Sequence, residues 1–173
     1  MEVIDNFLPE EEFLFLQKEI VFNSSVPFFL SDAVALDSIK NIEDGNWNWY
    51  GAHLLYFSPS PCSSYYDMVY EVLVKKLIEC DKAPFLRALL RMKINFYPFT
   101  CKLKEHHPHY DYDFDHTGCI FSLNTCDGYT KLEDGTKIDS VANRILIFDS
   151  SKLHSSTTTT NQKGRFNINI NYV

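Results

Sequence analysis

The second half of this chain is a succession of short β-rich segments, and this pattern is what most limits the possible folds. Turns are expected at Asp127-Gly128, Asp134-Gly135 and Lys163-Gly164, because aspartate and glycine favour tight reversals. The β-rich runs around them cover residues 89–97, 116–123, 137–140, 144–149, 153–160 and 165–173. Many short strands of this kind suit a jelly-roll core.

The first half has a different, largely helical character. Leu8-Pro9 is followed by three glutamates and an apolar pattern up to Val21, which predicts a helix with proline in its first turn and acids near the positive end of its dipole. Met68, Val72, Leu73 and Leu77 recur at helical spacing, so a second helix is expected to end near residue 80. Between the two, residues 53–57 favour a strand and 58–63 break it.

Together these patterns predict a mainly β protein with flanking helices, of the α+β class. Its core would be a double-stranded β-helix packed against the N-terminal helices. The length of 173 residues and the 45% apolar content are sufficient for one core, so we expect a single domain over 1–173. Residues 1–86 would supply mostly helical support and the first strands, and residues 87–173 the jelly roll that carries the candidate site.

Charge and composition exclude several classes of protein. The formal net charge of −7 opposes general binding to nucleic acid, which needs clustered lysine and arginine. No segment approaches the roughly 20 apolar residues of a membrane span, and the N-terminus lacks the basic start of a signal peptide. The five cysteines are odd in number and form no Cys-x-x-Cys pair, so we interpret them as reduced packing residues. We therefore expect a cytoplasmic protein without a membrane partner.

The candidate site begins with His109 and Asp111. Residues i and i+2 of an extended segment point to the same side, so these two can offer an imidazole and a carboxylate to one metal ion. His154 can complete a set of two histidines and one carboxylate on one face of the ion. That donor set, with the opposite positions open, is typical of non-haem Fe(II) oxygenases.

Other residues near His109 compete for the same role. His106, His107 and His116 lie close by in the sequence, but only His109 has a carboxylate two positions on. Asp113 and Asp115 would share a face with Asp111 if the segment were a regular strand, and proximity to His109 favours Asp111. His154 has no histidine competitor after residue 116.

Arg165 supplies a cation eleven residues after His154. Its planar, always charged guanidinium suits bidentate pairing with the far carboxylate of a dicarboxylic co-substrate. Lys163 is the alternative cation, but it lies beside Gly164 in the expected turn, where its side chain would face solvent.

With these residues in place, the chain resembles the prolyl-4-hydroxylase-like branch of the Fe(II)/2-oxoglutarate dioxygenases. The resemblance runs in order from about residue 90 to residue 173. It rests on the Tyr97-Pro98 strand, the His109-x-Asp111 pair, the Ser122-Leu-Asn124 strand end, Gly128-Tyr-Thr130, the apolar run 145–148, His154 and Arg165.

The resemblance implies a set of roles. Fe(II) would be bound by His109, Asp111 and His154, which are therefore the candidate catalytic residues, and 2-oxoglutarate would be bound by Arg165 with help from the Tyr97 hydroxyl. Ser122 stands where the family often has a tyrosine that binds the co-substrate, and serine reaches less far.

The activity that the resemblance implies is hydroxylation of a C–H bond, on a prolyl or similar side chain of a peptide or on a small molecule. Fe(II), 2-oxoglutarate and O₂ would be required, succinate and CO₂ would be released, and ascorbate would serve as reductant in vitro. Two other classes remain open. One is a zinc-dependent hydrolase on the same three ligands, and the other is a non-catalytic jelly roll that binds a ligand or partner.

Two further sequence features give weaker indications of function. Trp47, Trp49 and Tyr50 could line a substrate lid, but we favour the interpretation that they anchor the sheet to the helices. Residues 165–169 faintly resemble the Arg-x-Asn signature of nucleic-acid demethylases in the same superfamily, yet the second arginine is absent and the acidic charge opposes it.

Overall fold

A computed structural model describes residues 1–31, 34, 48–80, 82 and 86–173. The helices are α1 (Glu10–Ile20), α2 (Tyr66–Val69), the π-helical turn η3 (Tyr70–Val74) and α3 (Lys75–Glu79). The strands are β1 (Glu2–Ile4), β2 (Phe29–Ser31), β3 (Tyr50–Phe57), β4 (Ser60–Pro61), β5 (Leu89–Pro98), β6 (Thr117–Ser122), β7 (Tyr129–Leu132), β8 (Lys137–Asp139), β9 (Arg144–Asp149), β10 (His154–Ser155) and β11 (Gly164–Tyr172).

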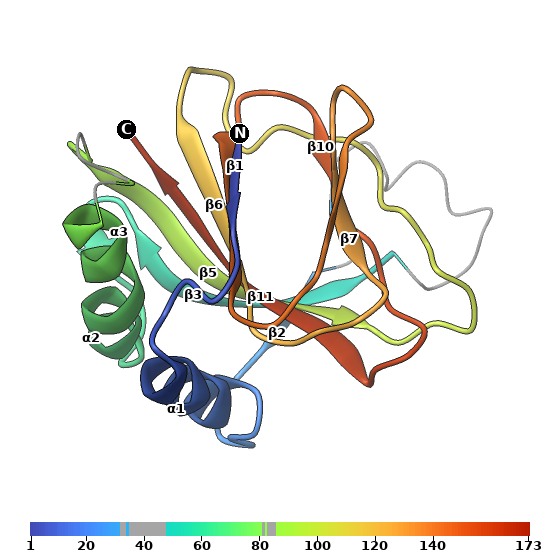
Figure 1. Ribbon diagram of the computed structural model, residues 1–173, viewed down its shortest axis with the longest axis horizontal. Coiled ribbons are helices and arrows are strands. Elements are labelled where there is room, and N and C mark those ends of the chain that lie inside the picture. The colour runs from blue at the N-terminus through green and yellow to red at the C-terminus, as the bar shows by residue number, and fades with distance from the viewer. Residues whose placement is uncertain (32–33, 35–47, 81, 83–85) are drawn as a thin grey trace.

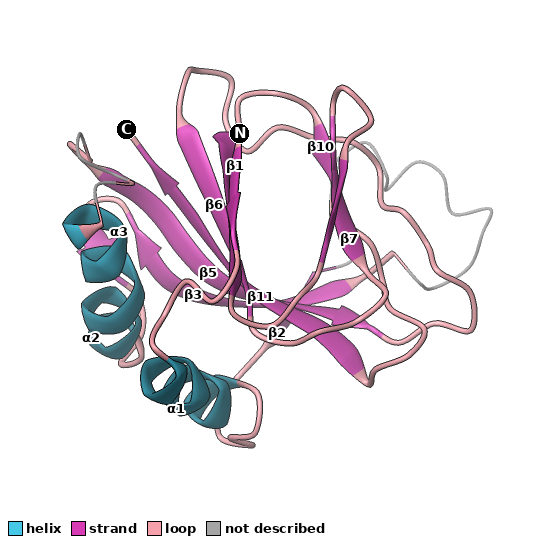
Figure 2. Cartoon of the chain, in the orientation of Figure 1, coloured by secondary structure: helices cyan, strands magenta, loops and turns pink. Residues whose placement is uncertain are grey.

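Two antiparallel sheets form the framework. The large sheet has the order β1-β9-β6-β11-β5-β3-β2, with β4 paired to β3, and the small sheet has the order β10-β7-β8. Figure 1 shows the helices against one face of the large sheet and the small sheet on its other side, and Figure 2 shows how strands dominate the molecule. The predicted α+β jelly-roll class is confirmed.

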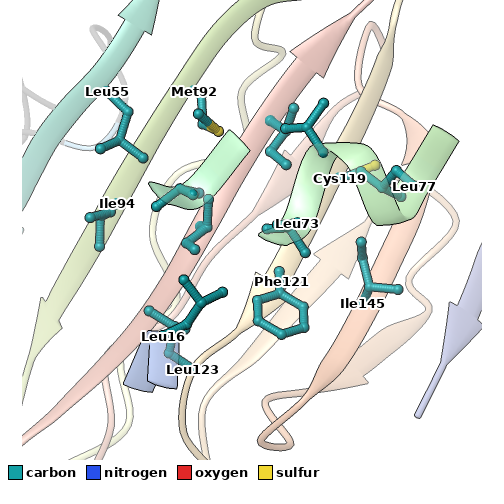
Figure 3. Close-up of a cluster of buried hydrophobic side chains, with 14 of the residues drawn as sticks. Leu16, Leu55, Leu73, Leu77, Met92, Ile94, Cys119, Phe121, Leu123 and Ile145 are labelled. Carbon is teal, nitrogen blue, oxygen red and sulfur yellow. The ribbon is translucent and has the colours of Figure 1, made fainter. Parts of the chain in front are cut away.

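The helices and the large sheet enclose the hydrophobic core. Helix α1 buries Phe13, Leu16 and Ile20, and the three glutamates of its first turn lie on its exposed side. Figure 3 shows the buried side chains of Leu16, Leu73 and Leu77 from the helices meeting apolar side chains from the sheet. None of the described helices is long and apolar enough to cross a membrane.

Alternation along β5 and β11 separates this core from a polar inner face. On β11, Ile168 and Ile170 belong to the core, whereas Arg165, Asn167 and Asn169 line a pocket. The register pairs Arg165 with Tyr97 and Asn169 with Lys93 of β5. Because successive side chains of a strand point to opposite faces, two neighbouring strands supply both the core and one wall of the pocket.

Several predicted elements differ from the structure. The predicted strand 153–160 is a two-residue strand at His154–Ser155, and the residues after it hydrogen-bond to the loop 98–106 instead of to a continuous ladder. The hydroxyl of Thr158 is part of the reason, because it bonds to the Thr100 hydroxyl and accepts from the Lys104 amide. The turn-and-propensity pattern also missed β1, β2, β4 and β7.

Candidate metal centre and pocket

Reciprocal backbone hydrogen bonds bring His109 and His154 together. The His109 amide donates to the His154 carbonyl and the His154 amide donates to the His109 carbonyl, both at 2.9 Å. The Asp111 amide in turn donates to the Ser150 carbonyl at 3.2 Å. His109 therefore sits in an isolated antiparallel bridge rather than in the regular strand that we expected, and the irregular segment after it carries Asp111.

The three side chains converge on one point. His109, Asp111 and His154 each offer a ligand atom, and these atoms all lie within 4.8 Å of one another. The two imidazole rings have centroids 4.6 Å apart, and His154 Nε2 lies 3.9 Å from Asp111 Oδ2. Among the described residues, no other group of at least three histidine, cysteine, aspartate or glutamate side chains gathers in this way.

Protonation states at this cluster suit metal binding. Burial, followed by the neighbouring His154, lowers the pKa of His109 to about 4, and burial also lowers the pKa of His154. Both imidazoles are therefore neutral at pH 7. His154 Nδ1 lies 3.0 Å from the Lys152 carbonyl, which fixes the proton on Nδ1 and leaves the Nε2 lone pair free for a ligand bond.

Asp111 is held in place as a carboxylate. Burial acts to raise its pKa, but the charges of Arg91 and Lys93 outweigh burial and keep that pKa far below its usual range. Arg91 donates to Oδ1 at 2.5 Å, while the Ser150 hydroxyl and the Asn171 amide donate to Oδ2 at 2.8 and 2.9 Å. These donors fix the orientation of the carboxylate, as groups around a metal ligand commonly do.

The competing residues of the sequence lie elsewhere. His106 is buried against the Ser156 hydroxyl at 2.9 Å, and His116 Nδ1 lies 2.8 Å from the Phe114 carbonyl. His107, Asp113 and Asp115 are exposed. None of these five belongs to the converging group.

Arg165 lies in the same pocket, with 1% of its surface exposed. Nη1 donates to the Tyr129 carbonyl and Nη2 to the Thr130 hydroxyl, each at 2.8 Å. In the described part of the chain, no carboxylate lies within 4.0 Å of its guanidinium. Gly128 makes room for this side chain, because a Cβ there would lie 2.8 Å from Arg165 Cδ.

Tyr97 and Ser122 have different positions. Tyr97 lines the pocket, its ring centroid lies 5.4 Å from the Arg165 guanidinium, and burial raises the pKa of its hydroxyl to about 12. Ser122 is buried on the same face of β6 as Ile120, but it is not among the residues that line the pocket. Its nearest side-chain partner is the Ser140 hydroxyl at 3.5 Å.

Of the three aromatic residues Trp47, Trp49 and Tyr50, the structure describes the last two. Trp49 packs on Phe96 of β5 with ring centroids 6.1 Å apart, whereas Trp47 lies outside the described residues. Tyr50 lines the pocket and stacks on Tyr97 at 5.8 Å, so it reaches the candidate site, and the anchoring of the sheet to the helices stays a prediction.

Sequence reasoning also missed four polar residues of the pocket wall. Lys93 and Asn95 come from β5, and Asn167 and Asn169 from β11. Asn95 Nδ2 donates to Asn167 Oδ1 at 3.0 Å across the two strands. The signal that could have found them is the strict polar–apolar alternation of residues 91–97 and 165–171, read outward from Tyr97 and Arg165.

Solved structures of other proteins share the fold of this chain. The chain is similar to a Pseudomonas putida prolyl-4-hydroxylase, with 12% identity, a TM-score of 0.64, and coverage of 99% of this chain and 91% of that one. It is also similar to a Trichoplax adhaerens prolyl hydroxylase in complex with a peptide fragment of hypoxia inducible factor, with 17% identity, a TM-score of 0.62, and coverage of 99% and 82%.

A third similar structure is the non-haem α-ketoglutarate-dependent epimerase SnoN from nogalamycin biosynthesis, with 12% identity, a TM-score of 0.65, and coverage of 99% and 76%. No protein-family model and no curated protein matches the sequence. At these identities the likeness defines the fold, which is the one found in 2-oxoglutarate-dependent non-haem enzymes. The resemblance drawn from the motifs is confirmed at that level.

Proposed function

We propose that this protein is an Fe(II)- and 2-oxoglutarate-dependent oxygenase that hydroxylates a C–H bond. One observation carries the proposal: a single pocket contains two neutral imidazoles, a fixed carboxylate and a buried arginine that has no acidic partner among the described residues. A buried cation of this kind is costly unless an anion joins it. The far carboxylate of 2-oxoglutarate is such an anion.

The donor set fits Fe(II). Two imidazole nitrogens and one carboxylate oxygen, all within 4.8 Å of one another, can reach a common ion and leave its other positions open. Bound there, Fe(II) would supply the redox chemistry that couples conversion of 2-oxoglutarate and O₂ into succinate and CO₂ to oxygen insertion into the substrate.

The residues of the chain have separate tasks in this proposal. Arg165 pairs with the far carboxylate of 2-oxoglutarate, and its bonds to Tyr129 and Thr130 hold the guanidinium in one orientation. Tyr97, whose pKa is raised to about 12, stays protonated and can donate its hydrogen bond. Its ring and that of Tyr50 limit the access of water to one wall of the pocket.

For the substrate we propose a peptide prolyl residue or a similar side chain or small molecule. Support comes from the fold shared with the two prolyl hydroxylases, of which the Trichoplax structure holds a peptide. This part of the proposal rests on analogy of fold, and a site of the same architecture can take other substrates.

Succinate formation tests the proposal. The full chain, supplied with Fe(II), ascorbate and 2-oxoglutarate, should produce succinate slowly even without its primary substrate. Succinate no higher than in a metal-free control would contradict it and favour a binding protein. Hydrolysis supported by Zn²⁺, with no succinate under Fe(II), would favour a zinc hydrolase. Screening peptides and metabolites for the mass gain of one oxygen atom then identifies the substrate.

A further inference from the structure

Lys93 places a second cation in the pocket. It lies on the inner face of β5, two residues from Asn95 and four from Tyr97, and it lines the same pocket as His109, Asp111 and Arg165. The side chain is only partly exposed, and burial, followed by repulsion from Arg91, lowers the pKa of its ammonium. The tasks proposed for the site give Lys93 no ligand of its own, although its charge helps to keep Asp111 ionised.

Lys93 forms no salt bridge in the part of the chain that the structure describes. Within the described ranges, no carboxylate oxygen lies within 4.0 Å of its ammonium. Asp111 interacts with Lys93 through its charge, but its two oxygens already accept hydrogen bonds from Arg91, Ser150 and Asn171. Among the described residues, the ammonium lies over the ring of Tyr50, 5.3 Å from the ring centroid.

Lys93 and Arg165 occupy different parts of the pocket. Arg165 faces the ring of Tyr97 at 5.4 Å, whereas Lys93 faces the ring of Tyr50, and these two rings are stacked on each other. Arg165 is the direct cross-strand partner of Tyr97, and Lys93 lies four residues before Tyr97 on β5. At about 3.3 Å per residue, this places their backbones roughly 13 Å apart along the sheet.

The two carboxylates of 2-oxoglutarate leave Lys93 without an anionic partner in the proposed complex. 2-Oxoglutarate has two carboxylates, of which one belongs to the metal-chelating end and the other is assigned to Arg165. Among the described residues Lys93 has no carboxylate partner in a salt bridge, and the far end of the co-substrate is assigned to Arg165. An ammonium in this position gains most from an anionic oxygen, because charge-assisted hydrogen bonds are the stronger ones where water is scarce.

We propose that Lys93 binds a carboxylate of the primary substrate, so that the substrate is an acid. This inference rests on the proposed oxygenase function and adds a substrate class to it. Tyr50 would position the ammonium through its ring. The other possible source of the carboxylate is the chelating end of 2-oxoglutarate itself, and the experiment separates the two.

The first arm of the experiment concerns 2-oxoglutarate. Calorimetric titration of the Zn²⁺-loaded full chain should give affinities in Lys93→Met and Lys93→Gln within about threefold of the wild-type value, and a much weaker affinity in Arg165→Ala. If Lys93→Met weakens 2-oxoglutarate binding as much as Arg165→Ala does, Lys93 serves the co-substrate and the inference is overturned. Absence of 2-oxoglutarate binding in the wild-type protein would instead overturn the proposed function, before any second ligand is added.

The second arm uses acetate and its uncharged counterpart acetamide, with Zn²⁺ and 2-oxoglutarate saturating. Saturation-transfer NMR of the methyl signals should detect acetate on the wild-type protein, with affinity at least about tenfold weaker for acetamide and for acetate on both Lys93 variants. Lys75→Met, which alters an exposed lysine paired with Glu71, serves as the control and should bind acetate normally. Equal binding of acetate and acetamide, or undiminished acetate binding to folded Lys93→Gln, would overturn the inference.

Discussion

At the scale of single residues, the proposed metal centre depends on three side chains that can reach one ion. Replacing His109, Asp111 or His154 by alanine should abolish retention of iron, because two remaining protein ligands hold Fe(II) poorly against water and chelators. Metal analysis after gel filtration in the presence of a weak chelator measures this. His107→Ala is the matched control, since it alters an exposed neighbour and should keep its iron. Equal loss in His107→Ala and His109→Ala would show that the wrong histidine has been chosen.

Substitution of Arg165 should separate the proposed co-substrate binding from metal binding. Loss of a charge-assisted partner for a buried carboxylate costs roughly 2–5 kcal/mol, so Arg165→Ala should retain Fe(II) but need about 30-fold more 2-oxoglutarate, or more still, for half-maximal succinate formation. Arg165→Lys should lie between, because it keeps the charge but not the planar fork. Unchanged dependence on 2-oxoglutarate in Arg165→Ala, with iron occupancy confirmed, would remove this residue from the site.

At the scale of secondary-structure elements, a substitution in the core on the outer face of the large sheet should change stability without changing iron affinity at the inner face. Leu16 of α1 is fully buried against the outer face, whereas Leu14 of the same helix is half exposed. Leu16→Ala should lower the free energy of unfolding by about 2–5 kcal/mol, and Leu14→Ala should change it by well under 1 kcal/mol. Urea denaturation measures both values. Iron affinity should be unchanged in each variant, and a loss of iron in folded Leu16→Ala would mean that the core and the site are coupled.

The sequence predicts long or strongly patterned elements well and short paired ones poorly. Strand β9 occupies the predicted residues 144–149, and β5, β6 and β11 lie within one or two residues of their expected bounds, because their β-rich composition coincides with burial. Strand β1 has three residues and exists through its pairing with β9, which no local pattern encodes. The segment 156–159 has strand-like threonines, but the Thr158 hydroxyl binds the neighbouring loop and the Thr159 hydroxyl binds Asp127.

In the candidate site, too, some residues can be predicted from the sequence and others cannot. His109, Asp111, His154 and Arg165 are recognisable because their residue types and spacing carry the chemistry. Lys93 and Asn169 reach the pocket only because β5 pairs with β11 in one particular register, and Arg91 meets Asp111 across 20 residues of chain. Contacts of this kind depend on tertiary pairing and leave no signature at fixed spacing.

For the whole molecule, the buried histidines predict how stability depends on pH. Burial lowers the pKa of His106 to about 3 and that of His109 to about 4, from an ordinary value near 6.5. Between pH 6.5 and about 4 the unfolded chain therefore binds protons that the folded protein does not, and the free energy of unfolding of the metal-free protein should fall as pH is lowered through this window.

Denaturant titrations at several pH values between 7 and 4 measure that slope. His106→Gln should make the slope of the free energy of unfolding against pH shallower, because it removes one buried imidazole that takes up a proton only on unfolding. His107→Gln, at an exposed position, should leave the slope unchanged. A slope that is the same in the wild-type protein and in His106→Gln would contradict the prediction.

The backbone bridge between His109 and His154 has a consequence for how the centre is loaded. The two reciprocal hydrogen bonds of that bridge are made by the main chain alone, so the arrangement of the site does not wait for an ion. For the proposed metal centre we therefore expect metal uptake to be a binding step on an assembled site rather than a folding step, unlike in small domains that fold only around zinc. The amides of both residues should exchange slowly with deuterium already in chelator-treated protein, and addition of Zn²⁺ should leave the cooperative unfolding transition intact while raising its midpoint.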